Sequence, residues 1–421
     1  MKTPTIAWSR MGSAPPPSVI ANLMTAALRT PGMLSLAAGF TDNTVLPTEA
    51  VTAAATRLLS QEPDRAYLQY GTNPGREGLR AGLLAHLRSY PGECAANMVP
   101  DDCVITNGSQ QALYISVQVL CDPGDIVFVE SPSYFVFLEL LRGLGVEPRG
   151  IPTTAEGEAD PAAFAERLDE MRKTGELARV KLIYLMGYHA NPSGSSIREE
   201  TKRALGNVLN RLPRPLPVIE DGAYRDLYFE SPHAAPSILS LREFADLPRL
   251  YAGTLTKPFA TGLKVGYAVM PQTAWRERLL RIKAHQDFGT AHFNQAILEN
   301  IVAEGTFHAF LQSVRPHYAA KMRALEDALR SEGLPEMGWQ WESPGGGLLL
   351  WVRTPEKFDT RMGRAFHQKC LSEKVLYVPG DVCFAENAPA NCLRLSTGNL
   401  PIKGIREGVR RLARAARAVF V

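Results

Sequence analysis

The feature that most constrains the fold is an alternation of short apolar segments with helix-like segments in the middle of the chain. Segments rich in Val, Ile and Leu, each about as long as a buried strand, lie at residues 104–106, 126–130, 182–186, 216–219, 250–252 and 265–270. Segments at 109–120 and 197–209 have helical patterns. Apolar strands separated by helices predict a largely parallel sheet covered by helices on both faces.

Polar side chains follow the predicted strands at the points where the strands end. They lie at residues 107–110, 189–191, 221–224 and 254–257. Parallel strands place their functional groups at their carboxyl ends, so we expect these segments to converge at one edge of the sheet. Ser109 and Gln110, which follow Gly108, also begin a predicted helix whose free backbone N–H groups suit an anion. A simple capped helix is the alternative interpretation of that segment.

Lys257 lies in a loop rich in Gly, Thr and Pro between two of the predicted strands. Thr254 and Thr256 precede this lysine, and a second cation, Lys264, follows it. Hydroxyl groups and a cation suit a phosphate, and a desolvated amine suits a carbonyl group. Pyridoxal phosphate (PLP) carries both groups. Taken alone, the loop is also compatible with a solvated surface lysine.

The length of 421 residues exceeds that of a single core, so we expect two domains. The pattern changes near residue 291, where long helices lead into Gly-rich and strand-like segments typical of a small α+β domain. We therefore predict an N-terminal arm at 1–45 that belongs to the small domain. A large cofactor-binding domain follows at 46–300, and the C-terminal small domain spans 301–421.

Composition argues against several other classes of protein. The 46 basic and 43 acidic residues are well mixed, which disfavours a nucleic-acid-binding surface. No apolar run has the length of a membrane span, and the N-terminus lacks the apolar core of a signal peptide. The six cysteines have no CxxC spacing and no nearby histidine pattern, which predicts reduced thiols, no metal site and a cytoplasmic protein.

Short motifs from about residue 35 to 400 occur in the order typical of a known family. They are Gln69–Gly71, Asn107–Gln111, Glu130–Tyr134, Asn191–Gly194, Glu220–Tyr224, Gly253–Lys257, Gly262–Tyr267 and Leu393–Leu395. The chain resembles the fold-type I PLP-dependent aminotransferases of class I and II, and among them the α-aminoadipate and kynurenine aminotransferases. The resemblance implies an α/β fold, with a mostly parallel sheet of the seven-stranded type in the large domain and an α+β small domain.

The resemblance also implies a role for each residue of the catalytic centre. Lys257 forms the Schiff base with PLP, and Asp221 is the partner of the pyridinium nitrogen. Asn191 and Tyr224 donate hydrogen bonds to the phenolic oxygen of the ring, and Tyr134 stacks on the ring face. A carboxylate beside the ring nitrogen keeps it protonated, and the protonated ring absorbs the electrons left when the Cα–H bond breaks. Lys257, Asp221 and Tyr224 are the predicted catalytic residues.

The other site residues follow from the same resemblance. The phosphate is expected to bind Ser109, Gln110, Thr254, Thr256 and Lys264. Tyr70 is expected to reach this site from the second subunit of a homodimer. Arg394 matches the α-carboxylate of the substrate bidentately, with Asn191 beside it and Gly39 in the N-terminal wall of the substrate pocket. The predicted partners are thus an amino acid, a 2-oxo acid and a second copy of the chain.

Several residues depart from the family pattern or allow other interpretations. Gly187 stands where proline is common, residues 188–190 replace a more usual aromatic–Gln pair, and Lys264 stands where arginine is common. Residues 38–43 also differ from the usual Gly-Gly-x-Pro pattern, which leaves substrate specificity open. Taken singly, Asp221 is compatible with a helix cap, Tyr134 with a core aromatic and Arg394 with an edge-strand charge.

The predicted reaction transfers an amino group between an L-amino acid with a large or extended side chain and a 2-oxo acid such as 2-oxoglutarate. A PLP-dependent β- or γ-lyase, or another enzyme with a Cα-carbanion mechanism, is the alternative, because one fold supports many chemistries. Some transcriptional regulators carry a domain of this family behind a DNA-binding domain. The resemblance begins within about 40 residues of Met1, so we expect an enzyme here.

Overall fold

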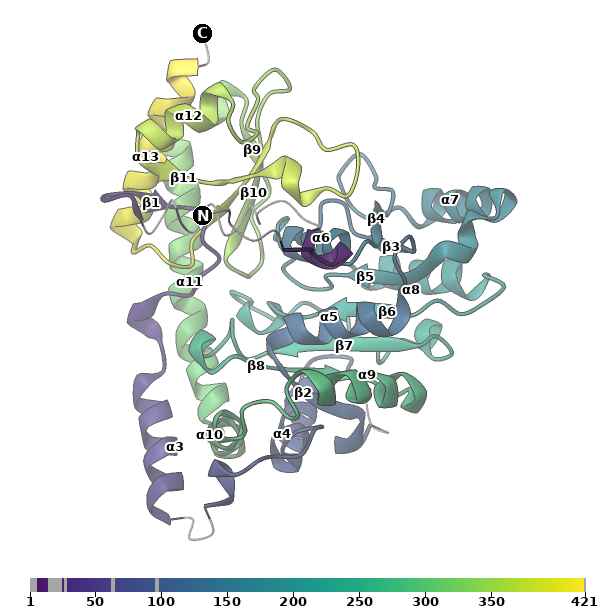
Figure 1. Cartoon of the computed structure of the whole chain (residues 1–421). Coiled ribbons are helices and arrows are strands. Elements are labelled where there is room, and N and C mark those ends of the chain that lie inside the picture. Colours follow the sequence, from purple (N-terminus) through teal and green to yellow (C-terminus); the bar gives the residue numbers. More distant parts are fainter. Residues whose placement is uncertain (1–5, 14–24, 26–28, 62–64, 95–97, 420–421) are drawn as a thin grey trace.

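The computed structural model describes residues 6–13, 25, 29–61, 65–94 and 98–419 (Figure 1). A seven-stranded sheet forms the centre of the larger part of the chain, and a four-stranded sheet lies in the smaller part. The predicted fold class is confirmed: a large α/β part with a mostly parallel sheet and a small α+β part. Much of the predicted N-terminal arm, including residues 14–24, lies outside the described residues.

The large sheet has the strand order β2-β8-β7-β6-β5-β3-β4. Its strands are β2 (Cys103–Asn107), β3 (Ile126–Val129), β4 (Glu147–Gly150), β5 (Val180–Leu185), β6 (Val218–Asp221), β7 (Arg249–Thr254) and β8 (Val265–Val269). All neighbouring strands are parallel except β8, which is antiparallel to β2 and to β7. Residues 255–264 connect β7 to β8 without a crossover helix, so the chain must turn back beside itself.

Helices cover both faces of this sheet (Figure 1). On one face lie α5 (Gly108–Leu120), α6 (Phe135–Gly143) and α9 (Thr273–Gln286), whose apolar side chains share a core with Val104, Leu182 and Ile219 of the strands. The other face contacts α4 (Glu77–Arg88), α7 (Pro161–Thr174), α8 (Glu199–Asn210) and α10 (His292–Ala303). The helix α3 (Thr48–Gln61) packs on α10. Alternate strand residues enter the two cores, as the pleat of a sheet covered on both faces requires.

The smaller part contains an antiparallel sheet of order β12-β13-β10-β9. Its strands are β9 (Gln340–Trp341), β10 (Leu349–Arg353), β12 (Val378–Pro379) and β13 (Cys392–Ser396), and its helices are α12 (Ala365–Ser372) and α13 (Ile402–Val419). The short strand β1 (Leu34–Ser35) pairs in parallel with β11 (Val375–Leu376), which joins the N-terminal segment to this part. The helix α12 begins at Ala365, directly after the bends and turns of residues 361–364.

The long helix α11 (Thr306–Ser331) connects the two parts (Figure 1). Its first half contributes Phe307, Leu311 and Val314 to the cores of the large sheet. Its second half contributes Met322 and Leu325 to the core of the smaller part. One helix therefore serves both cores, and the exact division of the chain at residues 45 and 300 stays a prediction.

Residues 37–42 carry the chain from β1 across to the large sheet. The Ser396 N–H donates to the Leu36 carbonyl at 2.7 Å, and Lys321 of α11 donates to the Asp42 carboxylate at 2.7 Å. Gly398 permits the close approach of the Phe40 carbonyl, because a Cβ at this position would lie 1.9 Å from that oxygen. These contacts fix residues 38–40 beside the carboxyl ends of the strands.

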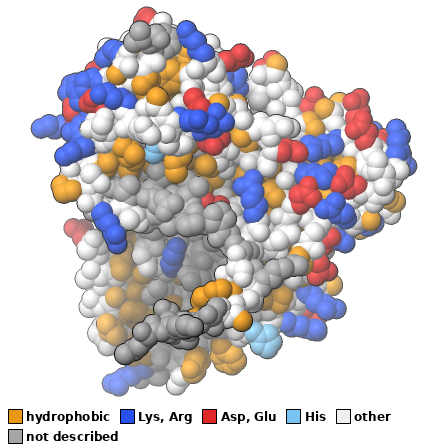
Figure 2. Space-filling model, turned by 45° about the horizontal axis from the view of Figure 1, so that its top comes forward, with side chains coloured by type: hydrophobic (Ala, Val, Ile, Leu, Met, Phe, Trp, Pro, Cys, Tyr) orange, Lys and Arg blue, Asp and Glu red, His pale blue; other side chains and the backbone are white. Residues whose placement is uncertain are grey.

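The charged surface, the helices and the metal-binding side chains were compared with the requirements of other classes of protein. Basic and acidic side chains are interspersed over the face shown in Figure 2. Among the described helices, none combines the length and the hydropathy needed to span a bilayer. Among all the residues that the structure describes, no group of three or more His, Cys, Asp or Glu side chains is arranged to hold a metal ion.

Candidate active site

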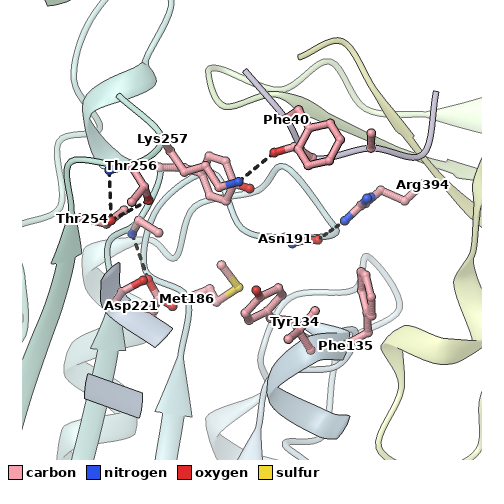
Figure 3. A pocket seen from close by; sticks show the side chains of 16 residues that line it. Phe40, Tyr134, Phe135, Met186, Asn191, Asp221, Thr254, Thr256, Lys257 and Arg394 are labelled. Carbon is pink, nitrogen blue, oxygen red and sulfur yellow. Dashed lines mark hydrogen bonds between the residues drawn. The ribbon is translucent and has the colours of Figure 1, made fainter. Parts of the chain in front are cut away.

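A pocket of about 170 Å³ lies at the carboxyl ends of β5, β6 and β7, between the large sheet and residues 38–40 (Figure 3). Its polar walls come from both parts of the chain. The residues that line it are Ala38, Gly39, Phe40, Ser109, Tyr134, Phe135, Val136, Met186, Asn191, Asp221, Ala223, Tyr224, Thr254, Thr256, Lys257 and Arg394. The structure thus brings ten of the predicted site residues to one cavity, as the position of polar segments after the strands led us to expect.

Lys257 enters the pocket from the loop between β7 and β8. The loop is held by a hydrogen bond from the Leu255 N–H to the Val265 carbonyl at 3.0 Å. The Lys257 Nζ donates to the Gly39 carbonyl at 2.7 Å (Figure 3). Burial lowers the pKa of Lys257 to about 8, and the positive charges of Arg394 and Lys264 contribute. Far more of this amine is therefore neutral, and nucleophilic, near neutral pH than in an ordinary lysine.

Asp221 is the last residue of β6, and its side chain lines the opposite wall of the pocket. Its carboxylate accepts hydrogen bonds from the Tyr184 hydroxyl at 3.0 Å and from the Ala223 N–H at 2.9 Å. Burial raises the pKa of Asp221 to about 6, although both hydrogen bonds favour the ionised form. A cation brought into the pocket would find here a carboxylate that is already desolvated and oriented.

Arg394 reaches the pocket from β13 of the smaller part. One terminal nitrogen donates to the Asn191 Oδ1 at 2.9 Å (Figure 3), and the other donates to the Ala37 carbonyl. Its Nε is buried without a partner, and no acidic side chain among the described residues pairs with this cation. The guanidinium carbon lies 5.4 Å from the centre of the Phe135 ring. A buried and unpaired guanidinium group is costly, and a carboxylate ligand would satisfy it.

Hydroxyl and backbone donors occupy a third side of the pocket. Ser109 lies in the first turn of α5, which begins at Gly108 with a φ of +66°. The Thr254 and Thr256 hydroxyls are 2.7 Å apart. The helix start lies close against β8, because a Cβ at Gly266 would be 2.4 Å from the Gly108 carbonyl carbon. Free N–H groups at a helix start together with hydroxyls form a suitable site for a phosphate.

Three predicted site residues lie outside this pocket. Gln110 lines a separate surface hollow together with Tyr114. Lys264 is exposed, with a left-handed φ of +59°, and acts on the pocket through its charge on Lys257. Tyr70 is 81% exposed and contacts the Phe288 ring at 5.9 Å. The single chain therefore does not bring these side chains to the other site residues.

The structure adds residues that sequence reasoning missed. Tyr184 supports Asp221 from the neighbouring strand, and Phe135, Val136 and Met186 line the pocket. Tyr184 pairs with Ile219 in register, so Asp221 is its diagonal neighbour on the same face. The pairing of β5 with β6 determines the contact between Tyr184 and Asp221, and this pairing cannot be read from a single sequence.

Comparison with known proteins identifies the family. Residues 31–412 match the family described as aminotransferase class I and II. The chain is 32% identical over 391 residues to the 2-aminoadipate transaminase of Thermus thermophilus. The aligned region covers 93% of this chain and 91% of that protein. It is 29% identical to aromatic-amino-acid aminotransferase 1 of Thermococcus litoralis, over 92% of this chain and 88% of the relative. The kynurenine aminotransferase of Pyrococcus horikoshii has a similar structure, with a TM-score of 0.87 at 27% identity over 98% of this chain and 97% of that one.

The chain belongs to the aminotransferase class I and II family. It is a PLP-dependent aminotransferase of amino acids, which confirms the predicted family, enzyme class and cofactor. A solved relative carries N-(5'-phosphopyridoxyl)-L-leucine, and another is in complex with PMP. The pocket fits such a cofactor and its substrate: Lys257 supplies an amine, Asp221 a buried carboxylate, and Arg394 an unsatisfied buried donor.

The lowered pKa of Lys257 leads to a prediction for the cofactor-free protein. The amine is protonated below about pH 8 and neutral above it, so its reaction with acetic anhydride should increase through this pH. Competition labelling with mass spectrometry measures this profile, with the exposed Lys173 of α7 as the internal reference. The variant Lys264→Met removes a neighbouring positive charge and should move the midpoint up by roughly half a pH unit at low salt. A midpoint that is unchanged or lower in the variant would contradict this account.

Proposed function

We propose that the enzyme exchanges an amino group between an L-amino acid with a large or extended side chain and a 2-oxo acid, with Lys257 as the anchor of the cofactor. The observation that carries this proposal is the meeting of a desolvated amine, a buried carboxylate and an unpaired arginine in one cavity. These groups match the aldehyde carbon, the ring nitrogen and the substrate carboxylate in turn.

The cofactor, when bound, supplies the electron sink for breaking the bond between Cα and hydrogen. Asp221 holds a proton on the ring nitrogen, and Tyr184 keeps its carboxylate in place with the hydrogen bond of 3.0 Å. With a substrate bound in the pocket, the free Lys257 Nζ would accept the Cα proton. Its pKa of about 8 suits this exchange of a proton near neutral pH.

Other pocket residues hold the cofactor in this proposal. Asn191 and Tyr224 donate hydrogen bonds to the phenolic oxygen, and Tyr134 covers one face of the ring. Ser109, Thr254 and Thr256 bind the phosphate, together with the backbone N–H of Gln110 in the first turn of α5 and the positive charge of Lys264. The position of Ser109 at the start of α5 and the contact between the two threonine hydroxyls support this arrangement.

The substrate side chain is assigned from the walls of the pocket. Arg394 and Asn191 bind the α-carboxylate, and Gly39 leaves room beside it. The neighbouring walls are the apolar side chains of Phe40, Phe135 and Val136. Apolar walls favour a large or extended side chain. The names of the relatives, which include aminoadipate, aromatic and kynurenine aminotransferases, support the same class of substrate.

We also propose a homodimer in which Tyr70 completes the site of the other subunit. Tyr70 and Phe288 form an aromatic pair that is largely exposed in the single chain, at 81% and 65%. The segment 69–71 is docked by a hydrogen bond of 2.9 Å between the Gln69 carbonyl and the His292 ring. Exposed aromatic side chains held in a fixed position favour a protein partner.

All six cysteines are free thiols, which supports a cytoplasmic location.

The substrate assignment predicts the outcome of a half-reaction. Purified holoenzyme is mixed with each amino acid in turn, without any 2-oxo acid, and products are quantified by chromatography. Amino acids with large or extended side chains should yield one equivalent of 2-oxo acid and one of pyridoxamine phosphate. Because Asp221 holds the ring proton, Asp221→Ala should slow this step on the order of 100-fold, whereas the exposed Asp246→Ala should not.

Two results would contradict this proposal. Release of ammonia with repeated turnover in the absence of acceptor would make the enzyme a β- or γ-lyase. Reaction only with small amino acids would leave amino transfer in place but overturn the substrate class.

The shared site predicts partial recovery of activity in mixed dimers. Tyr70→Phe removes one hydrogen bond to the cofactor, which should reduce activity about tenfold. Lys257→Ala should abolish it. If Tyr70 serves the other subunit, a mixed dimer has one site with both native residues and one site with both changes. Activity above that of either parent after subunit exchange, confirmed by native mass spectrometry, is expected. Activity no higher than the average of the parents would overturn the sharing of Tyr70.

A further inference from the structure

A buried ion pair lies directly behind the active site. Glu220 and Asp221 follow each other in β6, so their side chains point to opposite faces of the sheet. Asp221 faces the pocket, whereas the Glu220 Oε1 lies 2.6 Å from the Lys202 Nζ of α8. Both members of this pair are fully buried.

The remaining polar atoms of this pair are held by the backbone and by an aromatic ring. The Glu220 Oε2 accepts the Ile238 N–H at 2.9 Å, and the Lys202 Nζ donates to the Pro236 carbonyl at 2.9 Å. The Lys202 Nζ also lies 4.1 Å from the centre of the Tyr188 ring. The pair therefore has one fixed geometry, with its carboxylate on the residue that precedes Asp221 in β6 and its ammonium group on α8.

Gly187 is the residue that makes room for Glu220. A Cβ at position 187 would lie 2.3 Å from the Glu220 Oε1 and 2.8 Å from its Cδ. Any other residue would push the carboxylate out of place. This contact gives a physical reason for the glycine at a position where the family commonly has proline.

The gain in stability from such a pair does not explain its presence. Removing two charges from water costs about as much as their attraction returns, and apolar side chains of the same size often serve a fold equally well. The position of the pair next to active-site residues indicates a role in the active site. Glu220 adjoins Asp221, and Tyr188 lies three residues before Asn191. A second buried pair, Arg225 with Glu93 at 2.6 Å, adjoins Tyr224 in the same way.

We propose that Lys202 is a positioning residue whose ammonium group balances the buried charge of Glu220, so that Glu220 acts as a fixed negative charge behind Asp221. This inference rests on the proposed role of Asp221 at the ring nitrogen. The negative charge increases the affinity of Asp221 and its partner nitrogen for their shared proton. A protonated ring nitrogen is the condition for the electron sink.

Other titratable and charged groups surround Asp221 and Lys202, and apart from Glu220 the variants leave these residues unchanged. The groups whose charges act on Asp221 from its own face are Tyr184 of β5, Tyr134 and Glu130 after β3, and Tyr224 after β6, and Glu220 acts from the opposite face of β6. The groups that face Lys202 are Glu220, Tyr188, Arg225, Glu93, Glu130 and His233. Burial raises the pKa of Glu130 to about 8, so this residue is largely neutral near pH 6. Glu220 is the charge that raises the pKa of Asp221 further.

The experiment measures the dissociation constant of PLP from the cofactor-free protein between pH 4.5 and 8, by quenching of tryptophan fluorescence. Because burial raises the pKa of Asp221 to about 6, wild-type affinity should decrease below that pH as Asp221 becomes protonated. In Glu220→Gln the negative charge is absent. In Lys202→Met the unpaired Glu220 takes up a proton and becomes neutral. Both variants, and the double variant, should therefore shift the decrease to lower pH, by on the order of one unit.

Lys283→Met is the matched control. Lys283 is equally buried and pairs with Asp287 at 3.0 Å, but it lies in α9 and does not line the pocket. This variant should lose stability in a thermal melt without any shift in the pH profile. If one single variant does not fold, the other single variant and the double variant still test the inference.

The inference is overturned if Glu220→Gln and Lys202→Met melt at lower temperature but keep the wild-type pH profile. It is also overturned if their shifts add in the double variant, because removal of one common charge cannot be counted twice. A wild-type profile that does not decrease below pH 6 overturns it as well. Failure of amino transfer in an enzyme whose profiles behave as expected would bear on the proposed function and would leave this inference standing.

Discussion

The desolvation of a few opposite charges in one small cavity is the constraint on which the rest of the structure depends. Burial lowers the pKa of the Lys257 amine to about 8 and raises the pKa of the Asp221 carboxyl group to about 6. Both groups are thereby shifted toward their neutral forms, and Arg394 is buried without an acidic partner in the described part of the chain. Such a cavity is unfavourable for the protein alone and favourable for a ligand that carries complementary groups. The chemistry of a PLP-dependent aminotransferase requires a ligand of this kind.

The fold maintains this arrangement by closing the cavity from two sides. The large sheet supplies Asp221 and Lys257 at the ends of neighbouring strands, and β13 of the smaller part supplies Arg394. Residues 37–40 lie between them, where the Gly39 carbonyl accepts from Lys257 and the Ala37 carbonyl accepts from Arg394. The N-terminal segment therefore binds both cations of the site before any ligand does.

Much of this arrangement could be predicted from the sequence, and the remainder depended on contacts that a sequence does not contain. Apolar strands followed by polar residues predicted the sheet and brought Asn191, Asp221 and Lys257 together. The helix α6 was missed because its nine residues are mostly apolar and resemble a strand as much as a helix. Tyr184 was missed because its contact with Asp221 depends on the order of the strands. Tyr70 does not line the pocket of the single chain but a separate hollow beside His292, so its role in the site stays a prediction.

The most direct test of the central claim is the position of the covalent bond between cofactor and protein. The holoenzyme is reduced with borohydride, digested and mapped by mass spectrometry. The desolvated amine in the pocket predicts a phosphopyridoxyl group on Lys257 alone, at one equivalent per chain, and no label at this position when the holoenzyme of Lys257→Arg is treated in the same way. A label on Lys264 or on any other lysine of the native enzyme would contradict the account.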